Sequence, residues 1–160
     1  MWCHYGNLVD NGAIYGKLYN WFAVKLLQMD IDYYNAANPN AMWGWRVPTQ
    51  ADFNTLATTL GGAGVAGGKM KMQGTTYWNS PNTGADNSSG FSMLQTSYRH
   101  GGSGLHAISF TSQTWALTSD NLNAVRLTLY NNTSLATIDS IIAKTFGFSL
   151  RLIKTNTDNL

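Results

Sequence analysis

The sequence predicts one α+β domain with short antiparallel strands, few helices and long loops. Its 160 residues are 44% hydrophobic and 11% charged, which is enough apolar material for one core and less charge than most domains carry. Glutamate is absent, while Gly, Asn, Thr and Ser number 16, 16, 17 and 12. These residue types favour strands, turns and polar loops over helix interiors, so we expect no long solvent-exposed helix.

Charge and cysteine content exclude several classes of protein. The net charge is only +2 and the ten Lys and Arg residues are scattered, so we expect no nucleic-acid partner. No run of 18 apolar residues occurs and no basic-then-apolar leader opens the chain, so we expect neither membrane insertion nor a signal peptide. Cys3 is the only cysteine, which excludes an internal disulfide and a cysteine-based metal centre.

The first element in chain order lies within residues 14–24. Tyr15, Tyr19, Trp21 and Val24 contribute to a stretch that is dense in aromatic and β-prone residues. Such a run is typical of a buried strand, but a helix that begins inside it would have the same pattern. Both interpretations stay open.

A helix is predicted over residues 50–60. Thr49 is a typical N-cap, and Asp52 lies in the first turn, where the helix dipole favours an acidic side chain. One apolar face follows at helical spacing, and two glycines then end the helix. The next stretch, 62–67, matches the dinucleotide pattern G-x-G-x-x-G, but it follows a helix instead of a strand, so we interpret it as a glycine-rich loop.

Strands are predicted in the C-terminal half. Apolar and more polar residues alternate over 125–130 and again over 148–153, so each stretch reads as a strand with one side in the core. Residues 74–90 carry clustered Gly, Asn, Ser and Pro, which predicts a loop-dominated segment before these strands. No repeat or linker divides the chain, so we expect a single domain over residues 1–160.

The sequence lacks a motif for catalysis or metal binding. His4, His100 and His106 do not have the spacing of a metal site, and no Glu is present to act as a base. No G-x-S-x-G motif occurs, and the eight Asp residues are scattered along the chain. We therefore expect a protein that is not an enzyme and needs no cofactor.

Six ordered segments point to one family. They read YGKLYNW, GWRVPT, GGKMK, GTTYWNSPNTGA, GFS and GFSLR at residues 15–21, 44–49, 67–71, 74–85, 90–92 and 147–151. In this order they resemble the Fibrobacter succinogenes major paralogous domain over nearly the whole chain. That family is related to the formylglycine-generating-enzyme-like branch of the C-type lectin fold. The resemblance thus implies a C-type lectin-like domain with paired terminal strands and a loop-rich ligand face.

The chain lacks the residues that other proteins of this fold use for catalysis or calcium binding. The enzyme branch uses cysteine chemistry or a histidine-bound iron, and the lectins use a Glu-Pro-Asn or Gln-Pro-Asp calcium signature; neither occurs here. Residues 25–42 have no obvious family counterpart. The resemblance therefore implies binding without a metal, with a calcium site among Asp86, Asp120 and neighbouring Asn residues as the alternative.

A compositional break lies inside the resemblance. Some bacterial and phage proteins of this fold are variable proteins of diversity-generating retroelements, which randomise adenines chiefly in Asn codons. Randomised AAC gives N-N-C codons, which cannot encode Gln, Glu, Lys, Met or Trp. Residues 97–143 hold two such residues in 47, Gln113 and Trp115, whereas the other 113 positions hold 21. The alternative explanation is that β-rich loops simply favour Asn, Ser, Thr and Leu, and both explanations stay open.

If residues 97–143 are diversified, their exposed side chains form the binding surface and the flanking blocks form a rigid scaffold. Arg126 and Tyr130 are of the residue types that most often anchor interfaces. A cluster of isoleucines near residue 140 is either part of the core or an exposed contact patch. The predicted ligand-binding residues are His100, His106, Asp120, Asn121, Asn123, Arg126, Thr128, Tyr130, Asp139, Ile141 and Ile142.

The sequence thus predicts a non-enzymatic domain that binds a protein or glycan ligand on a cell surface. We expect it to be displayed outside the cell or on a virion surface, as a diversified variable protein of a phage or bacterium. The alternative is a structural or adhesive domain of a bacterial surface protein without diversification.

Overall fold

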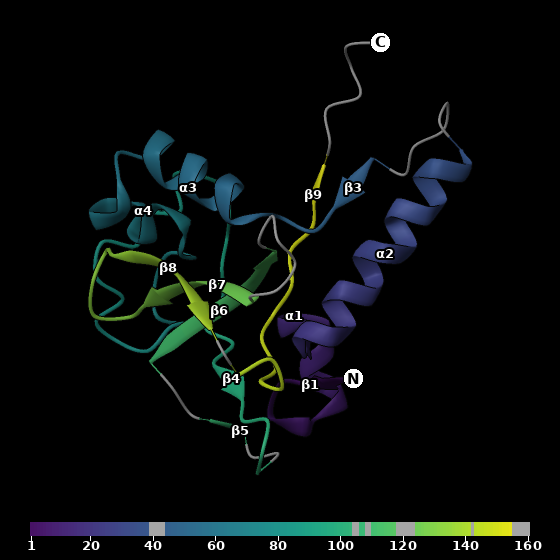
Figure 1. The fold of residues 1–160 in the computed structure, drawn as a ribbon. Helices are drawn as coiled ribbons and strands as arrows, with labels where there is room; N and C mark the ends of the chain where they lie inside the picture. The colour runs from purple at the N-terminus through teal and green to yellow at the C-terminus, as the bar shows by residue number, and fades with distance from the viewer. Residues whose placement is uncertain (39–43, 104–105, 108–109, 118–123, 142, 155–160) are drawn as a thin grey trace.

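Helices precede the main sheet along the chain (Figure 1). The computed structural model describes residues 1–38, 44–103, 106–107, 110–117, 124–141 and 143–154, with the backbone alone for residues 106, 107 and 141. The elements are β1 (Trp2–His4), η1 (Tyr5–Asn7), η2 (Val9–Asn11), α1 (Gly12–Tyr15), β2 (Lys17–Tyr19), α2 (Trp21–Ala37), β3 (Trp45–Arg46), α3 (Gln50–Thr59), α4 (Ala63–Met70), β4 (Tyr98–Arg99), β5 (His106–Ala107), β6 (Thr111–Leu117), β7 (Ala124–Tyr130), β8 (Ala136–Ile141) and β9 (Ile153–Lys154).

The strands are short and antiparallel, which confirms the predicted α+β class. The described part of the chain has a three-stranded sheet in the order β6–β7–β8 and three two-stranded pairs, β1–β2, β3–β9 and β4–β5. The N-terminal and C-terminal thirds meet at the β3–β9 pair and at a bridge between Tyr19 and Phe148. Segments far apart in the sequence therefore hold each other in place around the sheet.

One hydrophobic core lies between the helix pair α3 and α4 and one side of the sheet (Figure 1). Phe53 and Met70 come from the helices, and Leu127 and Leu129 face them from β7. All four side chains are buried. Because alternate residues of β7 supply this core, the predicted strand over 125–130 and its core-facing set are confirmed.

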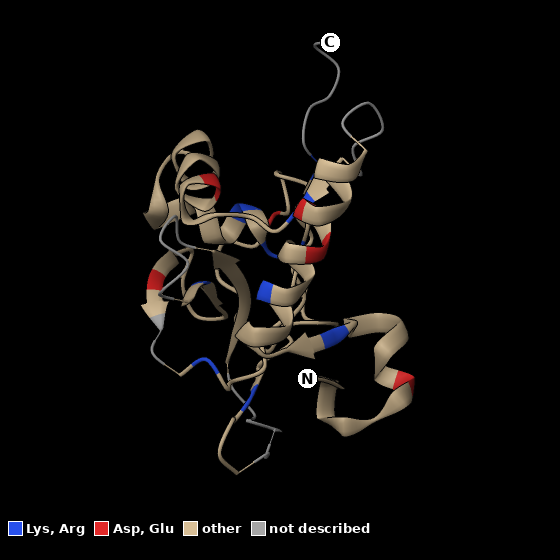
Figure 2. Cartoon of the chain, turned by 45° about the vertical axis from the view of Figure 1, so that its right-hand side comes forward, with Lys and Arg blue, Asp and Glu red and all other residues tan. Residues whose placement is uncertain are grey.

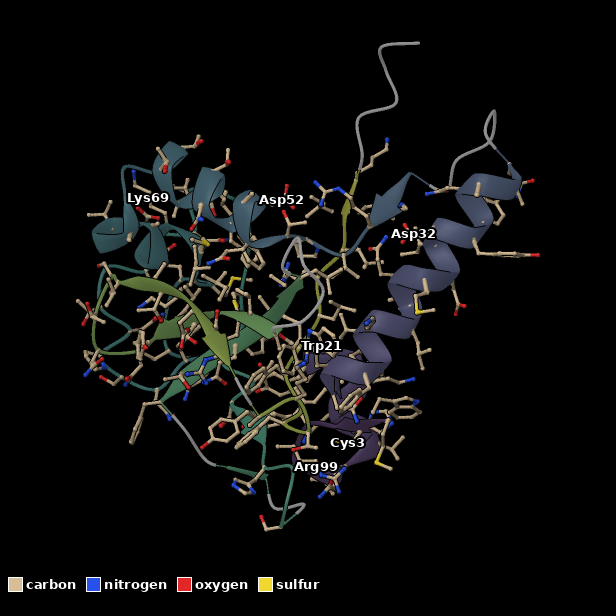
Figure 3. All side chains as sticks on the ribbon, viewed as in Figure 1. Cys3, Trp21, Asp32, Asp52, Lys69 and Arg99 are labelled. Carbon is tan, nitrogen blue, oxygen red and sulfur yellow. The ribbon has the colours of Figure 1, made fainter. Side chains whose placement is uncertain are left out.

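A second core joins α2 to the C-terminal segment. Trp21 and Val24 of α2 pack with Trp115 of β6 and with Phe148. The indole N–H of Trp115 donates to the carbonyl oxygen of Tyr19 at 2.6 Å, so this buried tryptophan has its polar atom satisfied. Figure 3 shows Trp21 at the start of α2, on the side of the helix that faces the body of the protein.

The helix predicted over 50–60 is confirmed as α3, Gln50–Thr59. Thr49 and Asp52 form a capping box in which each side chain accepts the other residue's backbone N–H. Arg46 donates to both oxygens of Asp52 at 2.6 and 2.7 Å, and this ion pair holds the pKa of the carboxyl well below its usual range.

Helix α2 contradicts the expectation of no long exposed helix. Its 17 residues begin after Asn20, whose side chain accepts the N–H of Ala23 at 3.0 Å, and end before Pro39. Buried residues at helical spacing pack this helix against the core. This packing stabilises the helix although the overall composition of the chain favours strands and loops. Residues 14–24, for which a strand and a helix were both open, contain both: strand β2 ends at Tyr19 and helix α2 begins at Trp21. None of the described helices is long and apolar enough to cross a bilayer.

Two further predictions were wrong. The glycine-rich stretch 62–67 lies mostly in helix α4, where a Cβ on Gly67 would overlap the backbone of Leu135 and a Cβ on Gly68 would overlap that of Gly84. These glycines allow a close approach of the helix to its neighbours. The strand predicted over 148–153 is reduced to β9 and isolated bridges, because successive residues there pair with different partners.

Candidate binding face

The side of the β6–β7–β8 sheet that faces away from α3 and α4 carries a group of polar side chains. Register partners of adjacent antiparallel strands share a side, and residues alternate between the two sides. At one end this side is part of the second core, through Trp115 and Ala124. Beyond that end it is polar. We call these seven residues the polar face: Thr111, Gln113, Arg126, Thr128, Tyr130, Thr137 and Asp139.

Arg126 and Asp139 form an ion pair across β7 and β8. The Nη2 of Arg126 lies 3.2 Å from Oδ2 of Asp139, and its Nε lies 3.4 Å from Oδ1. The two side chains are 29% and 46% exposed. A partly exposed cross-strand pair of this kind contributes on the order of 0.2–1 kcal/mol, so a ligand can exchange contacts with it at little cost.

Tyr130 and Thr137 continue the polar face. The Tyr130 hydroxyl lies 3.1 Å from Oγ1 of Thr137, and both residues are half-buried. A tyrosine in this position offers an apolar ring and a polar tip to a partner. The structure therefore places Arg126, Tyr130 and Asp139, three of the predicted residues, on one side of one sheet.

Thr128 is a correction to the predicted exposed set. It lies between Gln113 and Thr137 in the register, and it is only 3% exposed. Gln113, its neighbour on β6, is 4% exposed. The alternation along β7 was read correctly, but the middle of the polar face lies below the molecular surface.

Two buried polar atoms of this face have no hydrogen-bond partner among the described residues. They are Oε1 of Gln113 and Oγ1 of Thr128, from residues that are directly opposite each other. The amide nitrogen of Gln113 donates to Oγ1 of Thr111 at 2.8 Å, whereas its amide oxygen accepts no hydrogen bond from the described residues. Because buried polar groups are almost always paired, such orphan atoms mark a place that water or a ligand completes.

An aromatic cluster borders the polar face. The guanidinium carbon of Arg126 lies 5.8 Å from the centre of the Phe148 ring, and Phe148 packs on Phe146 at 6.2 Å. His100 lies 4.7 Å from Phe146, is exposed, and accepts the N–H groups of Gly102 and Ser103 at 3.3 Å. His100 therefore contacts the aromatic cluster and is not one of the residues of the polar face.

The remaining predicted residues are described in part or not at all. His106 opposes Arg99 in the β4–β5 pair, and Ile141 opposes Ala124 at the end of β8, with the backbone alone described. Four predicted residues lie outside the described residues: Asp120, Asn121, Asn123 and Ile142.

Sequence reasoning missed three members of the polar face: Thr111, Gln113 and Thr137. Thr137 had a signal in the sequence, because it alternates with Ala136 and Ile138, but residues 111–114 are all polar and show no period-two pattern. Their pairing with β7 was not readable, because the register depends on tertiary contacts that one sequence does not display.

Lys71 holds the end of the polar face in place from within the core. Its side chain is fully buried, and Nζ donates to the carbonyl oxygens of Thr83, Tyr130 and Thr133 at 2.9, 2.8 and 3.0 Å. Burial lowers the pKa of this amine to about 8. The three bonds tie the last residue of β7 and the following turn to the loop around Thr83.

The polar face offers hydrogen bonds and charge. Within the described residues, no group of three His, Cys, Asp or Glu side chains is close enough to hold a metal ion. A cavity of about 360 Å³ lies elsewhere, along β2 and the C-terminal segment, and Tyr15, Lys17 and Arg151 are among its lining residues. In the view of Figure 2, the Lys, Arg and Asp residues are scattered over several elements of the ribbon.

The family of the chain was established by comparison with known proteins. Neither the curated proteins nor the solved structures gave a match. A model of the Fibrobacter succinogenes major domain matches residues 1–154, which is nearly the whole chain and includes every strand of the polar face. The chain belongs to the Fibrobacter succinogenes major domain family.

Proposed function

We propose that this domain is a non-enzymatic binding protein that recognises a protein or glycan on a cell surface through the polar face. We further propose a C-type lectin-like fold, display on a bacterial or virion surface, and diversification of residues 97–143 by a retroelement. The observation that carries this proposal is the match between the compositional break and the sheet. Residues 97–143 include all three strands of the polar face.

The two exceptions to the compositional rule support it. Gln113 and Trp115 are the only residues of the 97–143 segment that N-N-C codons cannot encode. Both lie on β6 with exposed fractions of 4% and 0%. Trp115 packs in the second core, and the backbone of Gln113 accepts hydrogen bonds from Ser149. Trp115, whose side chain packs in the core, is the kind of residue that a diversified segment has to keep.

The chemistry of the face suits recognition of polar groups. It combines a partly exposed ion pair, a tyrosine hydroxyl and two buried orphan atoms, Oε1 of Gln113 and Oγ1 of Thr128. Hydroxyl and amide groups of a glycan or peptide would exchange hydrogen bonds with the partly exposed side chains of Arg126, Asp139 and Tyr130. Tyrosine and arginine are enriched among residues that dominate binding energy.

The genomic neighbourhood tests diversification. We expect a reverse-transcriptase gene and a near-copy of the DNA for residues 97–143 that carries adenines where the two copies differ. A neighbourhood without both would contradict diversification and would favour the alternative, a structural or adhesive domain whose strands favour Thr, Leu and Asn for ordinary reasons.

Binding is tested separately. The labelled domain is applied to a glycan array and to intact bacterial cells, and the Arg126→Ala and Tyr130→Ala variants are compared with wild type. We expect each substitution to weaken binding by about tenfold, the effect of losing about 1.4 kcal/mol at an interface anchor. Val65→Ala is the control, since Val65 is an exposed apolar residue on α4. Equal binding by all four proteins would contradict the assignment of the polar face.

A further inference from the structure

Helix α2 buries one side and exposes an apolar stripe on the other. Trp21, Val24 and Ile31 are its buried residues. The stripe has exposed fractions of 50, 61, 55 and 80% at Phe22, Leu26, Met29 and Tyr33. These residues are spaced by four, three and four positions, so they fall within an arc of about 60° on a helix of 3.6 residues per turn. This is the spacing of the a and d positions of a coiled-coil seam.

The inner side of α2 is firmly attached, so the stripe faces outward. Besides the three buried residues, Gln28 accepts the backbone N–H of Val47 through its side-chain oxygen at 2.8 Å. A continuous apolar row on the outer surface of an anchored helix is uncommon in monomeric soluble proteins and marks an interaction surface.

The charges beside the stripe are complementary to those of a second copy. With Leu26 at an a position, Lys25 is a g residue, Asp30 an e residue and Asp32 a g residue. A parallel pair of helices places Lys25 of one copy against Asp30 of the other, because g faces the e position five residues further along. An antiparallel pair places Lys25 against Asp32 instead. Figure 2 shows that α2 carries both signs of charge.

Nζ of Lys25 lies 5.4 Å from the centre of the Trp21 ring, a cation–π contact that an intermolecular ion pair would replace. Among the described residues, Lys25, Asp30 and Asp32 take part in no ion pair; Asp32 accepts one hydrogen bond from Gln28, through Oδ1. Each copy would therefore contribute one Lys25 and receive another, which gives two intermolecular ion pairs per dimer.

We propose that α2 is a self-association surface, through which two copies of this chain pair along the stripe formed by Phe22, Leu26, Met29 and Tyr33. The inference does not depend on the proposed ligand. Helix α2 packs against one end of the side of the β6–β7–β8 sheet that carries the polar face, through Trp21 and Val24, and the stripe lies on the opposite side of the helix. A dimer formed through the stripe would combine two polar faces in one particle, and two faces raise the avidity for a surface that carries many ligand copies.

Sedimentation velocity of the 160-residue chain over a concentration series tests the proposal. We expect the average mass to rise from 17.5 kDa toward twice that value as the concentration increases. The double variant Leu26→Gln with Met29→Gln should raise the dissociation constant at least tenfold. Val65→Gln, which changes an exposed apolar residue of α4, should leave it unchanged. Circular dichroism checks that each variant keeps the helical content of the wild type.

Charge exchange provides a second test that does not alter the stripe. Lys25→Asp alone should weaken association. Mixing it with Asp30→Lys should restore association for a parallel pair, and mixing it with Asp32→Lys should restore it for an antiparallel pair. A chain that stays monomeric at every concentration would overturn the proposal. So would an association that the stripe variant does not weaken, or one that neither mixture restores.

Discussion

Lys71 shows how one side chain stabilises a distant surface. A fully buried amine is costly unless its donors are used, and here each of its three N–H bonds meets a backbone carbonyl. Those carbonyls come from the loop at Thr83, from the last residue of β7 and from the turn that follows it. The residue therefore couples the helical part of the domain to the polar face.

Lys71→Met is expected to lower the free energy of unfolding by about 2–4 kcal/mol. Methionine fills a similar volume but leaves three buried carbonyl oxygens without a donor. Chemical denaturation measures the loss, with Lys69→Met as the control that should change stability by less than about 0.5 kcal/mol. Equal stability of the two variants would show that the carbonyls find water in the absence of the amine.

Thr128 and Thr114 are two buried threonines of the same sheet with opposite expectations. Oγ1 of Thr114 donates to the carbonyl oxygen of Ser149 at 3.2 Å, whereas Oγ1 of Thr128 has no partner among the described residues. Thr114→Val should cost about 1 kcal/mol of stability, and Thr128→Val should cost nothing or add stability, because it removes an unpaired buried hydroxyl. Denaturation of both variants decides this. A matching loss in the two would mean that water already satisfies Thr128.

At the scale of the element, the start of α3 combines a cap with an ion pair. Asp52 accepts from Arg46 and from the backbone N–H of Thr49, and it lies in the positive first turn of the helix. All of these contacts stabilise the ionised carboxylate, with the Arg46 hydrogen bond as the largest cause, so the pKa of Asp52 in the folded protein lies well below its usual 3.8.

This shift predicts a loss of stability in acid. Below pH 3.8 the unfolded chain takes up the Asp52 proton before the folded protein does, so the free energy of unfolding falls as the pH falls. Asp52→Asn should be less stable than wild type at neutral pH by about 1 kcal/mol, and the difference should shrink between about pH 4 and pH 2. Unfolding curves at several pH values test this, with Asp10→Asn as the control. A difference that stays constant with pH would contradict the assignment.

The elements differ in how far one sequence predicts them. Helix α3 was predictable because its cap, its apolar face and its glycine stop are all local signals. Helix α4 was not, because its glycines lower helix propensity and are explained only by the close approach of Leu135 and Gly84. Residues 148–153 have a strand pattern, but they contact several neighbours in turn and form isolated bridges.

At the scale of the whole molecule, a scaffold and a face are built from different parts of the chain. Helices α2, α3 and α4 and the C-terminal segment supply the two cores, and the sheet turns its polar side away from α3 and α4. Arg126 and Tyr130 could be assigned to the polar face from the alternating pattern of one strand. Gln113 and Thr137 could not, because their place on the face depends on the register between strands, and the burial of Thr128 depends on the tertiary structure.

The central claim is that the polar face varies while the scaffold stays fixed. Deep sequencing of this gene across a natural population of its host tests that claim most directly, without knowledge of the ligand. We expect amino-acid differences to concentrate in residues 97–143, to include Arg126, Tyr130 and Asp139, and to spare buried Trp115, Leu127 and Leu129. Differences spread evenly over the 160 residues, or gathered on α2, would contradict it.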